Sequence, residues 1–374
     1  MQSQCIKNWA GTYSMKSSQV RLEYLDSLRG LAAYIVVIGH FFPDGWIKNL
    51  PILNLITDTK LAVGIFFVLS GVVLTNPKYN LRMGFFWLPI QILARFFRLL
   101  IPVFAVAVFV WFLYSFNLVF NGELPDSYKN WEVYMQHYQS NVDFYRVIYF
   151  SWIEAFFMYD PITSLIPPAW TMRPELFGSV VVLSYVWLLQ KSFFKIYPIS
   201  LIFISTALVF SYGYLPFIYY FGFFFLGSAL RHISDNGMPI NKYPILFFAL
   251  VLSTKTIFET IEVDSFQLDF IFSGLIVFLL IQAKSLHNFM SRPFLLWLAK
   301  ISFPLYLLHV PLISSFGLHL MNYFGAVNID SSFGQFIVFT LLSILLFILS
   351  RLFLPFETLG INTSRWIRSF SIKK

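Results

Sequence analysis

Two residues of the sequence have types and a spacing that could support proton transfer inside an apolar helix. Arg29 and His40 lie eleven positions apart at the two ends of one apolar run. In a helix this separation is a rise of about 16 Å, which would leave Arg29 at one mouth of the helix and His40 deep inside. Burial disfavours the imidazolium, so a neutral His40 could act as a general base toward a hydroxyl. The alternative is a histidine that packs between helices and hydrogen-bonds to a nearby carbonyl.

A pair of arginines could bind an anion. Arg95 and Arg98 are three positions apart, which places them on one face of a helix. The forked guanidinium group suits phosphate oxygens, so the pair is a candidate phosphate site at the start of an apolar run. The alternative is that both residues are anchors on the inner surface of a membrane.

Two further polar residues lie in or near apolar runs. Glu175 could orient His40 or hold an acceptor hydroxyl; otherwise it would pair with nearby Arg173. His309 precedes Pro311, whose ring leaves a helical carbonyl without its donor. We expect His309 to satisfy such a carbonyl, with a substrate contact as the alternative.

Two residues are expected to support these groups rather than to react. Asp26 precedes Arg29 by three positions, so the two side chains should pair on one helix face. Ser70 is expected to pack closely or to hydrogen-bond within its helix. It is not in a Gly-x-Ser-x-Gly sequence, as the nucleophile of a hydrolase would be.

The composition indicates what kind of element must position these residues. Of 374 residues, 58% are hydrophobic and 12% are charged, and the mean hydropathy is +0.70. Soluble domains carry about 25% charged residues, so the chain is expected to be an all-α polytopic membrane protein. This composition excludes disordered, collagen-like and nucleic-acid-binding proteins. The single cysteine, Cys5, permits no internal disulfide, and no residue spacing predicts a metal site.

Charge-free apolar runs predict about ten transmembrane helices in a single membrane domain, 21–356. A polar tail, 1–20, precedes it without the apolar core of a cleavable signal, and Met15 is an alternative start. A basic tail, 357–374, follows. Two weaker apolar stretches, 83–94 and 144–159, are expected to be interfacial, and the second belongs to an extracytoplasmic loop, 121–169. The predicted spans are 30–43, 61–77, 99–120, 176–190, 196–212, 214–230, 243–254, 270–283, 301–318 and 331–350.

The basic residues predict that both termini are cytoplasmic. With ten crossings and the amino terminus inside, all but six of the 26 Lys and Arg residues fall on the inner side. An extra crossing at either weak stretch would move every later connection to the other side and remove this asymmetry. The exceptions are Lys48, Lys60, Lys129, Arg146, Arg173 and Lys255.

The motifs occur in an order that resembles the acyltransferase-3 family of integral membrane acyltransferases. A basic residue, ten intervening residues and a histidine match the family pattern, as does Arg-x-x-Arg. Arg173 and Gly178 depart from the pattern around Glu175. The residues that carry the resemblance are Arg29 with His40, Phe66 to Gly71, Arg95 with Arg98, Trp170 with Glu175 and Phe177, and Ser302 with Tyr306, His309 and Pro311.

The resemblance implies a membrane O-acyltransferase in a lipid bilayer, expected in the bacterial cytoplasmic (inner) membrane. It would move an acyl group, most simply acetyl, from cytoplasmic acyl-CoA to a hydroxyl of a carbohydrate or glycolipid acceptor outside, without a metal or nucleic acid. In this interpretation His40 and Glu175 are catalytic. Donor binding falls to Arg29, Arg95 and Arg98, and substrate contact or support to Asp26, Ser70, Tyr306 and His309.

Two other functions fit the same residues. Buried His, Arg and Glu also mark transport paths, so a transporter of a lipid-linked sugar or another polar solute, forming no bond, is the alternative. A structural membrane scaffold is the third possibility.

Overall fold

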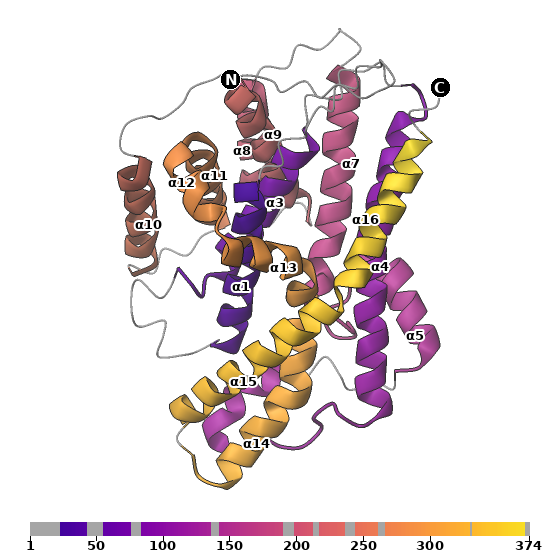
Figure 1. Cartoon of the computed structure of the whole chain (residues 1–374), viewed down its shortest axis with the longest axis vertical. Helices are drawn as coiled ribbons and strands as arrows, with labels where there is room; N and C mark the ends of the chain where they lie inside the picture. Colours follow the sequence, from indigo (N-terminus) through magenta and orange to yellow (C-terminus); the bar gives the residue numbers. More distant parts are fainter. Residues whose placement is uncertain are drawn as a thin grey trace, which may run out of the picture.

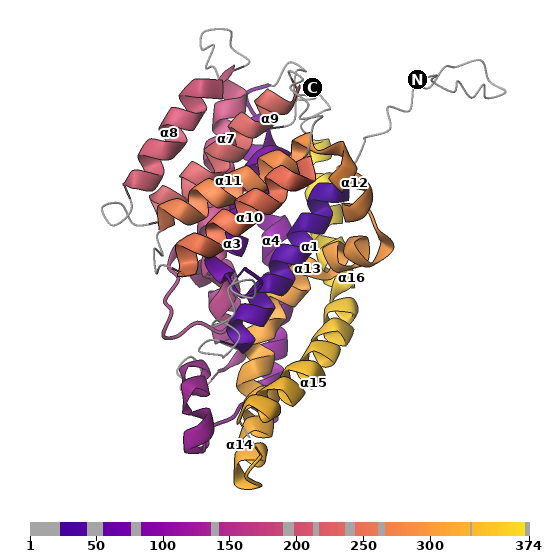
Figure 2. The ribbon, with the colours of Figure 1, turned by 90° about the vertical axis from the view of Figure 1, so that its left-hand side faces the viewer.

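The computed structural model describes residues 23–42, 55–75, 84–135, 142–189, 198–211, 217–235, 244–260, 266–329 and 331–370. Within these ranges the regular elements are helices and no strand is present (Figures 1 and 2). The predicted polar tail 1–20, Cys5 and Met15 lie outside the described residues. The chain is therefore all-helical where the structure describes it.

In the described part of the chain, eleven longer helices form the body of the protein, and each predicted span overlaps one of them. Shorter helical turns connect them: η3 (Asp126–Tyr134), α5 (Phe144–Tyr149), η5 (Phe150–Glu154), α6 (Ala155–Phe157), η6 (Pro167–Thr171), η7 (Ile218–Tyr220), α12 (Lys284–Met290), η8 (Ile313–Gly317) and α14 (Leu318–Ala326). The longer helices are α1 (Glu23–Phe41), α3 (Thr59–Leu74), α4 (Trp87–Ser115), α7 (Met172–Leu189), α8 (Pro198–Phe210), α9 (Phe221–Asp235), α10 (Pro244–Thr260), α11 (Phe266–Gln282), α13 (Pro293–Leu312), α15 (Ser331–Leu352) and α16 (Leu354–Ser369).

Three segments of the described chain are long and apolar enough to cross a membrane. They are Trp87–Ser115, Pro293–Ala326 and Ser332–Ser369, and shorter apolar helices accompany them at Thr59–Leu74, Ser200–Phe210 and Phe266–Gln282. About 20 residues are needed for a straight crossing, which the shorter helices do not reach by themselves. The chain is thus an integral membrane protein, while the number of ten crossings and their orientation stay predictions.

The stretch 83–94 is not a separate interfacial segment. Residues from Trp87 onward form the first turns of α4, which continues unbroken to Ser115. Pro89 is tolerated there because the first turn of a helix has no internal acceptor for its N–H groups. Arg95 and Arg98 consequently lie about 12 and 17 Å from the beginning of the helix, not at its start as predicted.

The stretch 357–374, predicted as a basic tail, is helical as far as Ser369. Residues Leu354–Ser369 form α16, which packs along α4 (Figure 1). Arg365 and Arg368 make this segment too polar to be recognised as a span from its composition. Its helical structure follows from burial of one face, which includes Gly360 and Ile367, against the bundle.

The core consists of helix pairs that approach closely at small residues. In the α1 and α13 pair, a Cβ on Gly30 would lie 2.6 Å from the backbone nitrogen of Ala299. In the α3 and α9 pair, a Cβ on Gly71 would overlap the carbonyl oxygen of Phe224, and one on Gly227 would overlap that of Val68. Small residues allow such approach in membrane proteins. These contacts fix α1 against α13 and α3 against α9.

Candidate functional site

His40 and His309 form a pair where α1 meets α13. Their ring centroids are 4.9 Å apart and the rings meet edge to face. His40 Nδ1 lies 2.8 Å from the carbonyl oxygen of Val36, and His309 Nδ1 lies 2.7 Å from that of Tyr306. Because a carbonyl only accepts, each Nδ1 carries the proton, and each Nε2 of the neutral rings keeps a lone pair. Both rings can therefore accept a proton or a hydrogen bond at Nε2.

The carbonyl that His309 bonds is not the one predicted. Pro311 has no N–H, so the helical carbonyl left without a donor is that of Leu307, four residues earlier. The His309 ring instead bonds the carbonyl of Tyr306, one residue before it. The side chain of a helical residue points toward the preceding turn, which brings the ring to the i−3 carbonyl.

The two histidines differ in access. His309 is fully buried, and its Nε2 has no hydrogen-bond partner in the described part of the chain. His40 is partly exposed, although its neighbours Gly39 and Phe41 are buried. The pair therefore combines a partly exposed ring with a fully buried one.

The loop 121–169 covers the end of α1 at His40. The hydroxyl of Tyr134, in η3, donates to the carbonyl oxygen of His40. Trp131 packs edge to face against Phe41 at 5.8 Å between ring centroids. This contact fixes the end of α1 through the buried aromatic residues of η3.

Tyr306 joins α13 to the segment that precedes α7. Its hydroxyl donates to the carbonyl oxygen of Pro168 at 3.0 Å and lies 3.1 Å from the hydroxyl of Thr171. Its ring also meets Phe66 of α3 at 5.7 Å between centroids. Tyr306 thus connects α13, η6 and α3 beside His309, and its role in the reaction stays a prediction.

Glu175 is held by two elements other than its own. It accepts a hydrogen bond of 2.7 Å from the Ser70 hydroxyl and one from Arg95, which also donates to Ser179 at 3.2 Å. The alternative pairing of Glu175 with Arg173 is wrong, because Glu175 pairs with Arg95 and the Arg173 guanidinium lies over the Phe217 ring at 4.1 Å. None of the described contacts of Glu175 reaches His40, so its catalytic role stays a prediction. Ser70, predicted to pack or to bond within its helix, instead binds this carboxylate.

The two arginines of the predicted pair differ in their hydrogen bonding within the described ranges. Arg95 is buried and bound to Glu175. Arg98 is half-buried, and no hydrogen bond or ion pair to it is found within the described ranges; the charges around it belong to Arg29, Arg95, Arg368 and Glu357. Five unsatisfied N–H donors on one guanidinium group are suited to an anion. Arg98 therefore has donors available for an anion, and its binding of phosphate stays a prediction.

Asp26 and Arg29 pair as predicted. The Arg29 Nη1 atom lies 3.8 Å from Asp26 Oδ1, and both side chains keep about a quarter of their surface exposed, 26% each. The contact is long and partly solvated, so its contribution to stability is small. Arg29 is also near enough to Arg98 of α4 to act on it electrostatically.

Side-chain contacts connect the histidine pair to the arginines. From His309 they pass to Tyr306 and then to Phe66, and one turn further along α3 is Ser70, which binds Glu175. The two surface hollows described, at 122–135 and at 351–362, are not lined by these residues. The candidate site therefore has two polar ends, which are joined through α3 and α7. One end is the pair of His40 and His309, and the other is the arginines with Glu175.

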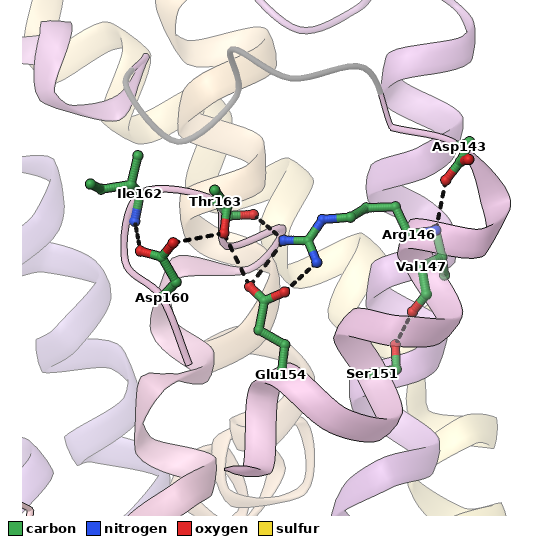
Figure 3. A network of polar contacts seen from close by, with 8 residues as sticks. All are labelled: Asp143, Arg146, Val147, Ser151, Glu154, Asp160, Ile162 and Thr163. Atoms are coloured by element: carbon green, nitrogen blue, oxygen red, sulfur yellow. Dashed lines mark hydrogen bonds and ion pairs between the residues drawn. The ribbon is translucent and has the colours of Figure 1, made fainter. Parts of the chain in front are cut away.

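An ion pair between Arg146 and Glu154 orders the part of the loop 121–169 that precedes η6 (Figure 3). Arg146 donates to both carboxylate oxygens of Glu154, at 3.0 Å for the longer contact, and to the carbonyl oxygen of Thr163 at 2.7 Å. The Thr163 hydroxyl donates to Asp160 at 3.1 Å. Glu154 is only 3% exposed. A buried carboxylate satisfied in this way makes the loop rigid.

The fixed loop continues to η6 through Tyr159. Its hydroxyl donates to the carbonyl oxygen of Pro167 at 2.8 Å, next to Pro168, which Tyr306 binds. Burial raises the pKa of Tyr159 to about 12, so the hydroxyl keeps its proton and remains a donor at neutral pH. Tyr306 and Pro168 are 138 residues apart along the chain, so the connection between them cannot be read from neighbouring residues.

A comparison with protein families gives a match over nearly the whole chain. The acyltransferase-3 family model, described as an acyltransferase domain, matches residues 22–354. No curated protein and no solved structure matches the chain. The matched range includes Arg29, His40, Glu175 and His309 and ends where α16 begins. With its helical membrane segments and this match, the chain belongs to the acyltransferase-3 family.

Proposed function

We propose that this protein is a membrane O-acyltransferase that takes its acyl group, most simply acetyl, from cytoplasmic acyl-CoA. The acceptor is a hydroxyl of a carbohydrate or glycolipid on the extracytoplasmic side. Family membership supports the class of reaction. The observation that carries the mechanism is the hydrogen bond from His40 Nδ1 to the carbonyl of Val36, which leaves Nε2 of this partly exposed ring able to accept a proton.

In this mechanism Nε2 of His40 removes the proton of the acceptor hydroxyl as its oxygen attacks the thioester carbonyl. The carbon–sulfur bond then breaks, and coenzyme A leaves as a thiolate that takes the proton back from the imidazolium. His40 returns to its neutral form, and the ester keeps the acyl group. General-base catalysis of this kind contributes about 10²- to 10⁴-fold to the rate.

The donor's phosphates would bind at the opposite end of the site. Arg98 offers an open guanidinium group, and Arg29 adds a second one nearby. Arg95 serves a different purpose, because its bond to Glu175 fixes α4 against α7. Coenzyme A carries its phosphates at one end and the thioester on a long arm, so the two polar ends match the two ends of the ligand.

The test is acyl transfer by membranes that contain the protein. Radiolabelled acetyl-CoA is added, and label is followed into glycan and lipid fractions. His40→Ala should lower the transfer by about 10²- to 10⁴-fold at an unchanged protein level. The control is His319→Ala, which removes an exposed histidine outside the site.

Two results would count against the proposal. Full activity of His40→Ala would remove this residue from the mechanism. Movement of an unmodified solute across the membrane, with no label incorporated by the wild-type protein, would favour the transporter.

A further inference from the structure

Trp170 and Arg173 contact the residues at η7 and form one cluster with them. The Arg173 guanidinium lies 4.1 Å from the centre of the Phe217 ring, and the centres of the Trp170 and Tyr220 rings are 5.4 Å apart. Trp170 lies in η6 and Arg173 in the first turn of α7, whereas Phe217 directly precedes η7 and Tyr220 ends it. The two stretches therefore face each other through two contacts, which hold the half-buried side chains of Trp170 and Arg173 in place.

Arg173 has an aromatic contact but no acidic partner in the part of the chain that the structure describes. Neither an ion pair nor a hydrogen bond of its side chain is found there, and its buried Nε atom is without an acceptor. The face of the Phe217 ring attracts the cation but provides no oxygen for its N–H groups. Charge-assisted hydrogen bonds are strong where water is partly excluded, so this half-buried cation is suited to an anion from outside the protein.

The residue under the guanidinium has an unusual backbone conformation. The φ angle of Phe217 is 48°, in the left-handed region that a bulky aromatic residue rarely adopts. Such conformations persist where the surrounding structure requires them, and they are frequent at ligand sites. The strained residue is thus the one that positions the Arg173 cation.

The cluster lies beside the histidine end of the candidate site. Thr171 directly follows Trp170, and its hydroxyl lies 3.1 Å from that of Tyr306. The Tyr306 ring is in turn 5.9 Å from the ring of His309 between centroids. Arg173 is also one of the six basic residues that the predicted orientation leaves outside the cytoplasm, on the side of the proposed acceptor.

We propose that Arg173 and Trp170 bind the acceptor and select an acidic carbohydrate, one that carries a carboxylate or a phosphate. This inference rests on the proposed function, since the acceptor is the ligand. The guanidinium fork binds the anionic group, and the sugar lies on the indole of Trp170, because the apolar C–H groups of a pyranose pack on aromatic rings. Arg173 departs from the family pattern, which fits a role in choosing the acceptor of this particular protein.

The experiment measures the binding of three glycosides that share one sugar ring. Purified full-length protein in detergent is titrated, by saturation-transfer NMR, with methyl glucoside, methyl glucuronoside and methyl glucoside 6-phosphate. The first is neutral, the second carries a carboxylate and the third a phosphate. At least one acidic compound should bind about 10- to 100-fold more tightly than the neutral one, the gain typical of a hydrogen bond to a charged group. The tighter of the two identifies the anion of the acceptor as a carboxylate or a phosphate.

Two variants separate the contact to the anion from the contact to the ring. Arg173→Gln should bind the acidic compounds only as tightly as the neutral one, because the charged donor is lost. Trp170→Leu should weaken the binding of all three compounds by the same factor, because all three carry the ring. Arg173→Lys keeps the charge but not the fork, so an intermediate preference is expected, and this variant gives a decision if Arg173→Gln does not fold.

The matched control is Arg292→Gln. Arg292 is exposed, and its guanidinium also lies over a phenylalanine ring, that of Phe289 at 4.9 Å. This variant removes the same charge and the same kind of contact away from the cluster. It should bind the three compounds as the wild type does.

Three outcomes would overturn the assignment: equal binding of the three compounds by the wild type, no binding of any of them, and an unchanged preference in Arg173→Gln. If the preference depends on Arg173 but labelled acetyl is never transferred, the proposed function fails while the site stands. If the wild type transfers acetyl and Arg173→Gln binds as Arg292→Gln does, only the present inference fails.

Discussion

At the scale of single residues, local backbone contacts decide what the histidines can do. Each ring is anchored within its own helix, His40 to Val36 and His309 to Tyr306. A carbonyl oxygen has two lone pairs, so it can accept from the ring in addition to the helix. A hydrogen bond from the ring to a nearby carbonyl was the packing role considered from the sequence. The same bond holds the proton on Nδ1 and so leaves Nε2 free to accept one.

Replacing His309 tests the function of its buried Nε2. His309→Phe keeps a flat ring beside His40 but removes the only unpaired acceptor of that side chain. If this nitrogen binds the acceptor hydroxyl, the acceptor KM should rise by about 2- to 10-fold, the effect of one neutral hydrogen bond, with the donor KM unchanged. Steady-state kinetics with each substrate varied in turn measure this.

His319→Phe is the control, since that histidine is exposed on α14. A change in the donor KM alone would contradict an acceptor contact for His309. Equal melting temperatures of the two variants would show that the packing is retained.

At the scale of elements, close helix contacts position the polar residues. Gly71 of α3 and Gly227 of α9 lie where the backbones of the two helices touch. Ser70, the neighbour of Gly71, hydrogen-bonds to Glu175 of α7. The depth at which α3 packs on α9 therefore determines whether Ser70 reaches Glu175.

A methyl group at either glycine should force α3 and α9 apart. Gly71→Ala and Gly227→Ala would each place a Cβ against a carbonyl oxygen of the facing helix, at a cost of about 1–3 kcal/mol or more. We expect a lower melting temperature in detergent and reduced acyl transfer through the lost Ser70 contact. Gly84→Ala is the control, because nothing lies within 4 Å of a Cβ there. Unchanged melting of both interface variants would show that the helices can separate at no cost.

At the scale of the whole molecule, composition predicted where helices form better than which helices and side chains contact one another. Apolar runs located the helical bundle because burial in lipid requires continuous apolar residues. They missed α16, whose helix is stabilised by packing against α4, and they separated 83–94 from α4 because of Pro89. A sequence shows only close neighbours, so Glu175 was paired with Arg173 and not with distant Arg95.

The orientation of the whole chain can be tested by labelling single cysteines. The beginning of α1 and the end of α16 lie at the same end of the molecule (Figure 1), which an even number of crossings requires. The distribution of basic residues assigns this end to the cytoplasm. In a Cys5→Ser background, Glu23→Cys and Arg365→Cys should therefore resist a membrane-impermeant maleimide in right-side-out vesicles and react after permeabilisation. Lys129→Cys, on the exposed surface of η3, should react in both conditions.

Labelling of Glu23→Cys but not Arg365→Cys in right-side-out vesicles would mean an odd number of crossings. Labelling of both would place the arginines, and with them the donor, outside.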